Sequence, residues 1–128
     1  MNLIRFLQRL LAATAVALCA AGPAYATPSA SEQKVIETLI ERVADHKSMT
    51  FMRNGEEHDA AEAARHLRAK YDHFKERIVT AEDFIRLCGT RSEVTKAPYK
   101  VRTASSGTRD SAEFLHDELR QVRRQVKG

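Results

Sequence analysis

Cysteine is scarce in this sequence of 128 residues, which contains only Cys19 and Cys88. Cys19 falls within a segment that we predict to be cleaved, so the remaining chain has one thiol and cannot form an internal disulfide. We therefore expect the fold to depend on packing alone. Cys88 follows Phe84 and Ile85 at the spacing of an inward helix face, which favours a buried core residue over a reactive thiol.

Long apolar runs are also scarce, because the sequence has one such run, at residues 10–21. This run is too short for a membrane helix, which needs ~20 apolar residues. Two arginines precede it, and the Ala-Tyr-Ala sequence after it offers the small residues that signal peptidase accepts. We therefore predict a cleaved signal peptide over residues 1–26, a single domain over residues 27–128, a periplasmic location and no transmembrane segment after cleavage.

Neither sign of charge is in large excess. The net charge is +4 for the whole chain and +2 once the two arginines of the leader are removed. This value gives no support for a nucleic-acid partner. The sequence also lacks a phosphate-binding loop, a nucleophile motif and any pair of histidines four residues apart. We therefore predict no cofactor and no metal site.

Apolar residues recur at helical spacing in four segments, and a capping residue precedes each of them. The predicted N-caps are Ser29, Asp59, Thr80 and Ser111. The first three are followed three residues later by an acidic residue, which is the spacing of a capping box. Gly89 is expected to end the third helix in the left-handed conformation.

Short segments with turn residues between them favour an antiparallel sheet. The predicted strands are residues 49–53, 56–58 and 98–102. Asn54 and Gly55 indicate a tight hairpin between the first two strands, because both residues tolerate a positive φ. Residues 104–109 are predicted to form a turn rich in serine. The predicted fold is therefore α+β, with a three-stranded antiparallel sheet (a hairpin plus one later strand) packed with about four helices.

Four ordered blocks of the sequence resemble a known family. The blocks are FMRNGEEH at residues 51–58, HLRAK at residues 66–70, TAEDFI at residues 80–85 and Pro-Tyr at residues 98–99. This pattern resembles the YfeK-like family of small exported bacterial proteins, a domain family of unknown function. The resemblance covers nearly all of residues 27–128. It implies a small periplasmic domain and supplies no activity, substrate or catalytic residue.

Six polar residues form the candidate binding surface. They are Arg53, His66, Lys70, Arg91, Ser92 and Tyr99. His66 and Lys70 are one turn apart on the flank of their helix, where we expect it to meet the edge of the sheet. The other four are expected to converge on the same edge. Arginine and lysine would supply charge, and serine and tyrosine would supply directional donors, which suits an anionic ligand.

Our main functional prediction is a non-catalytic binding or accessory protein of the cell envelope, with an envelope protein or a small anionic ligand as its partner. The alternative is a small hydrolase or transferase that uses His66 and Lys70, since a histidine beside a lysine has the lowered proton affinity that a general base needs. A purely structural role for both residues is also open. One concave pocket lined by these two residues, Arg53 and Tyr99 would favour the enzyme.

Overall fold

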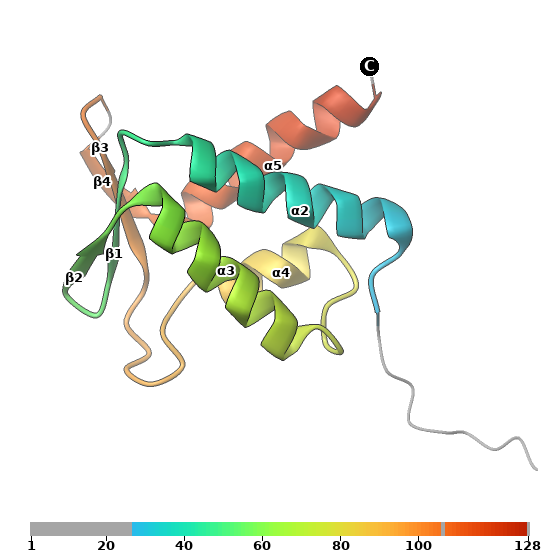
Figure 1. The fold of residues 1–128 in the computed structure, drawn as a ribbon, viewed down its shortest axis with the longest axis horizontal. Helices are drawn as coiled ribbons and strands as arrows, with labels where there is room; N and C mark the ends of the chain where they lie inside the picture. Colours follow the sequence, from blue (N-terminus) through green and yellow to red (C-terminus); the bar gives the residue numbers. More distant parts are fainter. Residues whose placement is uncertain (1–26, 106, 128) are drawn as a thin grey trace, which may run out of the picture.

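The computed structural model describes residues 27–105 and 107–127, so the predicted signal peptide lies outside the described residues. In chain order the elements are the helix α2 (Ala30–Asp45), the strands β1 (Thr50–Arg53) and β2 (Glu56–His58), the helices α3 (Ala60–Phe74) and α4 (Ala81–Cys88), the strands β3 (Lys100–Thr103) and β4 (Gly107–Asp110), and the helix α5 (Ser111–Lys127). The sheet lies at one end of the molecule, and the helices extend from it (Figure 1).

The sheet has four antiparallel strands in the order β2-β1-β3-β4, so the prediction of three strands is wrong. The additional strand, β4, lies in the segment that was predicted to be a turn. Its sequence, Gly-Thr-Arg-Asp, has no apolar alternation, because an edge strand needs only backbone pairing with its neighbour. Without that alternation the sequence carried no strand signal. The α+β class is confirmed.

The hairpin between β1 and β2 is confirmed. Asn54 and Gly55 both have positive φ, at 53° and 79°, as a tight hairpin turn requires. Phe51 of β1 pairs with His58 of β2 on one side and with Val101 of β3 on the other. Paired residues point to the same face, so these side chains share the inner face of the sheet, toward the helices. Phe51 and Val101 are buried there.

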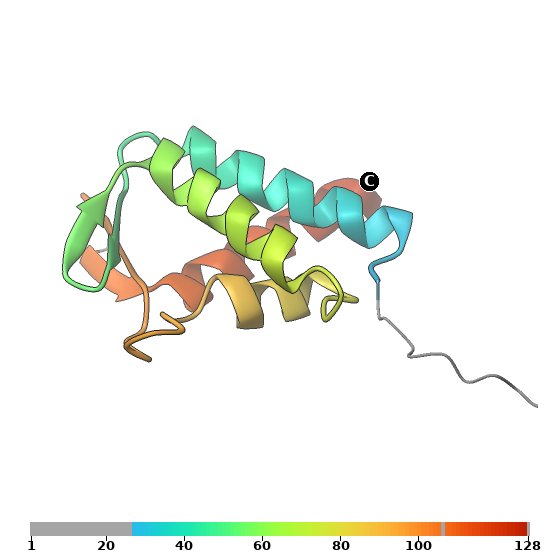
Figure 2. The same cartoon turned by 60° about the horizontal axis from the view of Figure 1, so that its bottom comes forward.

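The helices form two layers that enclose the core (Figure 2). In this view α2 and α3 lie side by side, with α4 and α5 beneath them. The largest side chains that are fully buried come from α2, α4, α5, β3 and the α3–α4 connection: Phe84, Ile36, Leu39, Ile40, Ile78, Ile85, Leu115, Val43, Val101, Val122 and Cys88. The prediction that Cys88 belongs to the core is confirmed, and burial raises the pKa of its thiol to about 12.

Three of the four predicted N-caps are confirmed, and Ser111 is instead the first residue of α5. Two of the acidic residues predicted to complete capping boxes bind other groups. Thr80 forms a complete capping box at the start of α4. Ser29 and Asp59 also accept the expected backbone N–H at the third helical residue. The carboxylate of Glu32, however, binds Arg123 and the backbone N–H of the first residue of α4. That of Glu62 binds a histidine of β2.

Gly89 ends α4 for a different reason from the one predicted. Its φ is −113°, so the expected left-handed conformation is wrong. A Cβ at this position would lie 2.3 Å from Cδ1 of Leu115, whose side chain is 1% exposed. The glycine therefore allows the close approach between α4 and α5, because a larger residue would displace the Leu115 side chain.

Candidate functional site

Four of the six predicted site residues meet where α3 crosses the sheet. They are Arg53 at the end of β1, His66 and Lys70 on α3, and Tyr99 just before β3, and we call them the basic cluster. A guanidinium nitrogen of Arg53 contacts Nδ1 of His66, and Nε2 of the same ring lies 3.1 Å from the hydroxyl oxygen of Tyr99. The ammonium nitrogen of Lys70 lies 3.3 Å from that hydroxyl oxygen.

The chemistry of these groups determines the direction of each hydrogen bond. An arginine only donates, so Nδ1 of His66 accepts and the ring proton lies on Nε2. Nε2 therefore donates to the Tyr99 hydroxyl, which also accepts from Lys70. A hydroxyl has two lone pairs and one proton. With both lone pairs occupied, the Tyr99 proton is left to donate outward, and no acceptor for it is found within residues 27–105 and 107–127.

Burial and neighbouring cations keep His66 neutral. Burial is the largest cause, followed by the charges of Arg53 and Lys70, and together they lower the pKa of His66 to about 4. Burial also lowers the pKa of Lys70, although the Glu93 carboxylate opposes this. Burial raises the pKa of Tyr99, so its hydroxyl keeps its proton. At neutral pH the cluster therefore presents two cations joined by two neutral hydrogen-bonding groups.

Arg53 is half-buried, and no carboxylate pairs with it in the described part of the chain. Its recorded polar partner is the neutral ring of His66. Lys70, by comparison, has a side chain that is 11% exposed and a distant carboxylate partner, Glu93, at 4.0 Å. Buried charges are normally paired, since removing them from water is costly. The basic cluster therefore has a cation, Arg53, that lacks a carboxylate partner among the described residues.

The other two predicted residues contribute to the loop rather than to the cluster. Ser92 is buried, and its hydroxyl oxygen accepts hydrogen bonds from Asn54 and from the backbone of Val94 and Thr95. It thereby ties the loop of residues 91–98 to the hairpin. Arg91 contributes its carbonyl oxygen, which accepts from Lys70 at 3.2 Å, while its side chain is exposed.

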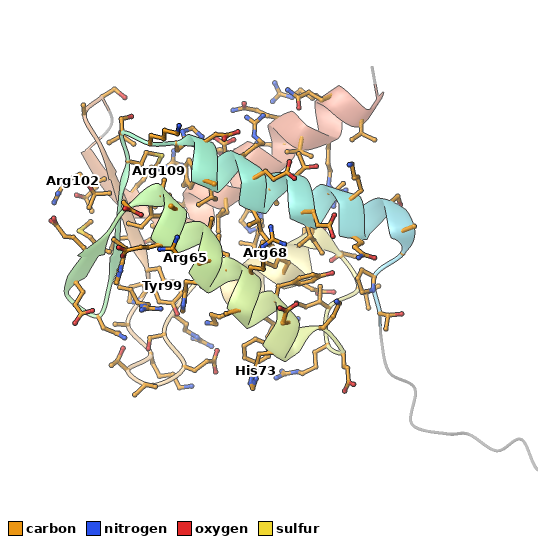
Figure 3. All side chains as sticks on the ribbon, viewed as in Figure 1. Arg65, Arg68, His73, Tyr99, Arg102 and Arg109 are labelled. Atoms are coloured by element: carbon orange, nitrogen blue, oxygen red, sulfur yellow. The ribbon has the colours of Figure 1, made fainter. Side chains whose placement is uncertain are left out.

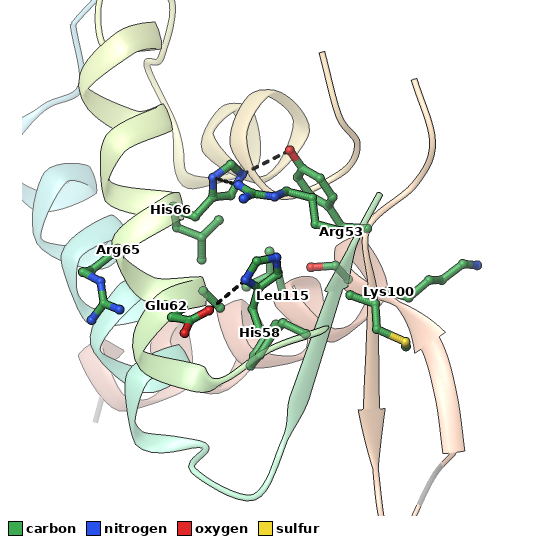
Figure 4. A pocket seen from close by; sticks show the side chains of 13 residues that line it. Arg53, His58, Glu62, Arg65, His66, Lys100 and Leu115 are labelled. Atoms are coloured by element: carbon green, nitrogen blue, oxygen red, sulfur yellow. Dashed lines mark hydrogen bonds and ion pairs between the residues drawn. The ribbon is translucent and has the colours of Figure 1, made fainter. Parts of the chain in front are cut away.

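Two cavities share the basic cluster as a common wall. The outer groove, of about 540 Å³, is lined by all four cluster residues together with Ser92 and Glu93. The inner pocket, of about 270 Å³, lies between α3 and the inner face of the sheet and includes Arg53, His66 and Tyr99 in its lining (Figure 4). The outer groove is thus a concave surface lined by Arg53, His66, Lys70 and Tyr99, the arrangement that would favour an enzyme. Against that role, both ring nitrogens of His66 are already engaged.

The inner pocket also contains a histidine–carboxylate pair that was not predicted from the sequence. Nδ1 of His58 lies 2.8 Å from the carboxylate of Glu62 (Figure 4). Nε2 of the same ring is buried and has no hydrogen-bond partner. The two residues are four apart, but His58 was assigned to a short strand and Glu62 to a helix cap. Because a strand precedes the helix, their spacing did not suggest contact.

Apolar side chains make up much of the remaining wall of the inner pocket. They are Phe51, Ala63, Leu67 and Leu115. Arg65 on α3 is exposed and also lines this pocket (Figure 4), whereas Arg68 on the same helix is exposed and is not among the lining residues (Figure 3). Among the described residues, no group of three His, Cys, Asp or Glu side chains could hold a metal ion, and no helix is long and apolar enough to cross a membrane.

Comparisons with known proteins agree with the resemblance found in the sequence. The model of a family of unknown function, DUF5329, matches residues 30–123, which include every residue of the basic cluster and the inner pocket. The uncharacterized protein YfeK of Salmonella typhimurium is 40% identical over 84 residues, which cover 66% of this chain and 70% of that protein. No solved structure gives a significant match.

Proposed function

The chain belongs to DUF5329, a family of unknown function, and from that premise we propose that it is an exported, non-catalytic binding protein of the cell envelope. Its ligand is a small apolar molecule with an acidic group, held between α3 and the sheet. The observation that carries this proposal is the half-buried guanidinium of Arg53, which faces a neutral imidazole instead of a carboxylate.

An anion would complete the hydrogen bonding of the basic cluster. Arg53 has further N–H groups beyond the one that contacts His66, and arginine matches the two oxygens of a carboxylate. The spare hydroxyl proton of Tyr99 needs an acceptor. Lys70 adds positive charge from the outer side of the same wall. A carboxylate beside Arg53 and Tyr99 would satisfy all of these groups.

The inner pocket indicates the size and character of the rest of the ligand. Its volume of about 270 Å³ corresponds to roughly nine water volumes at ~30 Å³ each, the scale of a molecule with about ten non-hydrogen atoms. Leucine, phenylalanine and alanine side chains line the pocket, so that part of the ligand is apolar. Benzoate has this size and combines an acid with an apolar ring, which makes it a suitable probe.

A base or nucleophile role for His66 and Lys70 is less well supported by the geometry. To take a proton, His66 would first have to lose the hydrogen bond from Arg53 at Nδ1. Its low pKa also makes it a weak base. Lys70 donates to the Arg91 carbonyl and the Tyr99 hydroxyl, which uses the ammonium form. The same contacts suit a binding site, in which these donors hold their positions.

Export is supported by the leader pattern of residues 1–26. The full-length gene should be expressed in a Gram-negative host, followed by cell fractionation and mass measurement of the product. We expect a periplasmic protein whose mass corresponds to residues 27–128. A full-length product in the cytoplasm would contradict this part of the proposal.

The binding site is tested with benzoate and its neutral analogue benzamide, titrated into the recovered protein and followed by NMR. We expect benzoate to bind more tightly than benzamide, with shifts at Arg53, His66 and Tyr99. Arg53→Gln should weaken benzoate binding by about 10–100-fold, the loss expected for a hydrogen bond to a charged group. Arg68→Gln removes the same charge from the exposed side of α3 and should change little. Equal affinity for the two probes, or an unchanged Arg53→Gln variant, would refute the acid-binding site.

A further inference from the structure

The histidine–carboxylate pair of the inner pocket extends the proposed site to a second polar contact. We infer that the ligand carries an O–H or N–H group in addition to its acid, and that this group donates a hydrogen bond to Nε2 of His58. The ligand class is therefore a small apolar acid with a hydroxyl or amino substituent. This inference rests on the proposed acid-binding function, and it concerns residues outside the basic cluster.

Glu62 determines which nitrogen of His58 is available. An ionised carboxylate only accepts hydrogen bonds, so Nδ1 of the ring carries the proton that it shares with Glu62 at 2.8 Å. In the neutral ring, Nε2 is then an acceptor. Glu62 also fixes the orientation of the ring, as carboxylates do for histidines in metal sites. The lone pair of Nε2 is thereby held in one direction.

Nε2 of His58 is shielded from water, and no hydrogen bond within the described structure replaces the one that water would make. The atom is buried and has no hydrogen-bond partner. The nearest carboxylate oxygen, on Glu56, is 3.8 Å away, too far for a hydrogen bond, and that side chain is 77% exposed. Buried polar atoms are nearly always partnered, so an exception within a cavity indicates a missing partner.

Among the described residues, one further buried side-chain atom without a partner provides a contrast. The hydroxyl of Tyr71 is also unpartnered, but its ring packs edge-on against Phe84 in the core, with centroids 5.8 Å apart. His58, in contrast, lines the inner pocket. Only the histidine is therefore placed beside space that a ligand could fill.

The inner pocket has two poles of different character. Arg53 and His66 lie at one end, and His58 with Glu62 lies at the other (Figure 4). The first end provides donors for an acid, and the second provides one acceptor. Apolar side chains such as Leu67 and Leu115 line the space with them. A ligand that matches both poles has an acid at one end, an apolar body and a donor at the other end.

The test compares benzoate with 2-, 3- and 4-hydroxybenzoate at about pH 8, where neutral imidazole is the ordinary form. We expect one hydroxy isomer to bind roughly tenfold more tightly than benzoate, because a pocket with an unpaired polar atom favours the ligand that pairs it. The preferred isomer would report the separation of the two poles. If every hydroxy isomer binds no more tightly than benzoate, the inference is overturned.

Variants identify the residue responsible for the preference. The ratio of hydroxybenzoate to benzoate affinity should fall to about one in His58→Phe, which has no ring nitrogen. His58→Gln retains an acceptor and should keep part of the preference, and it serves as the second variant if the first fails to fold. Tyr71→Phe removes the other unpartnered atom and should leave the ratio unchanged. A preference that survives in both His58 variants would also overturn the inference.

The outcomes separate this inference from the proposed function. Binding of benzoate without a hydroxyl preference would leave the acid site standing and remove the role of His58. Loss of both benzoate and hydroxybenzoate binding in the Arg53→Gln variant, with the preference present in the wild type, supports both. If none of the four probes binds the wild type, both proposals fail for acids of this size.

Discussion

Two regions of this molecule treat buried charge in opposite ways. Where α2 packs on α5, the buried carboxylate of Glu118 accepts from Arg42 at 2.6 Å and lies 3.0 Å from His46. Where α3 crosses the sheet, Arg53 faces a neutral ring and one nitrogen of His58 has no partner. In the first region, the buried carboxylate has its partners within the chain. In the second region, Arg53 lacks a carboxylate and Nε2 of His58 lacks a hydrogen-bond donor.

This difference distinguishes charged groups that stabilise the fold from polar groups that are available to bind a ligand. Arg123 continues the pattern of the first region, because it binds Glu32 and Glu82 together and thereby ties α5 to α2 and α4. Such a network can stabilise the fold on its own. A half-buried cation without a carboxylate does not, so its presence beside a cavity is better explained by binding.

The largest expected effect compares the same substitution in the two regions. Leu39→Ala removes a side chain that is fully buried in α2, and we expect it to lower the free energy of unfolding by about 3–5 kcal/mol. Leu67→Ala removes a side chain that borders the inner pocket, so fewer contacts are lost and the cost should be about 1–2 kcal/mol. Urea unfolding measures both. Equal losses would mean that the pocket is closed in solution.

A second pair of variants compares the charges. Arg123→Gln leaves the carboxylate of Glu32, whose side chain is 18% exposed, without its cation, and should cost about 1–2 kcal/mol. Arg53→Gln removes a cation without a carboxylate partner and should change stability by less than about 0.5 kcal/mol. Thermal or urea unfolding is again the measurement. A large loss for Arg53→Gln would show that this residue holds the fold, and the comparison would fail.

The third expected effect, close in size to that of Arg123→Gln, is a pH dependence that belongs to the second region. The unfolded chain protonates His66 as pH falls through about 6.5, whereas the folded protein does so only at about 4. The unfolded state binds more protons in this window, so stability falls as pH decreases from about 6.5 to about 4. We expect a loss of about 1–2 kcal/mol after allowance for solvent screening of this half-exposed ring. In His66→Gln, unfolding measured over the same window should show a shallower slope, and identical slopes would contradict the assignment.

Much of the local structure was predictable from short patterns. Thr80 with Asp83 forms the expected capping box, and Asn54-Gly55 forms the expected hairpin turn, because both signals depend on neighbouring backbone groups. The burial of Cys88 followed from its helical spacing with Phe84 and Ile85. These features require nothing from distant parts of the chain.

Features that depend on pairing across the chain were not predictable in the same way. The strand β4 exists because β3 offers a free edge, and its own residues give no periodic signal. The role of Gly89 depends on Leu115, 26 positions away, which fills the space where a Cβ would lie. Glu32 and Glu62 have the spacing of cap partners, but their carboxylates bind groups that the fold brings closer.

The sequence by itself determined the helices with three of their caps, the hairpin, the composition of the core and the family resemblance, because each depends on local spacing or on residue types. It also named four residues that meet in the basic cluster, since their polar side chains and the place of His66 and Lys70 on a helix flank are visible in the chain. Only the tertiary structure decided that Arg53 faces a neutral His66 and that His58 has a free nitrogen in a pocket. Whether a polar group is paired depends on the three-dimensional surroundings of each atom, which no spacing along the chain specifies.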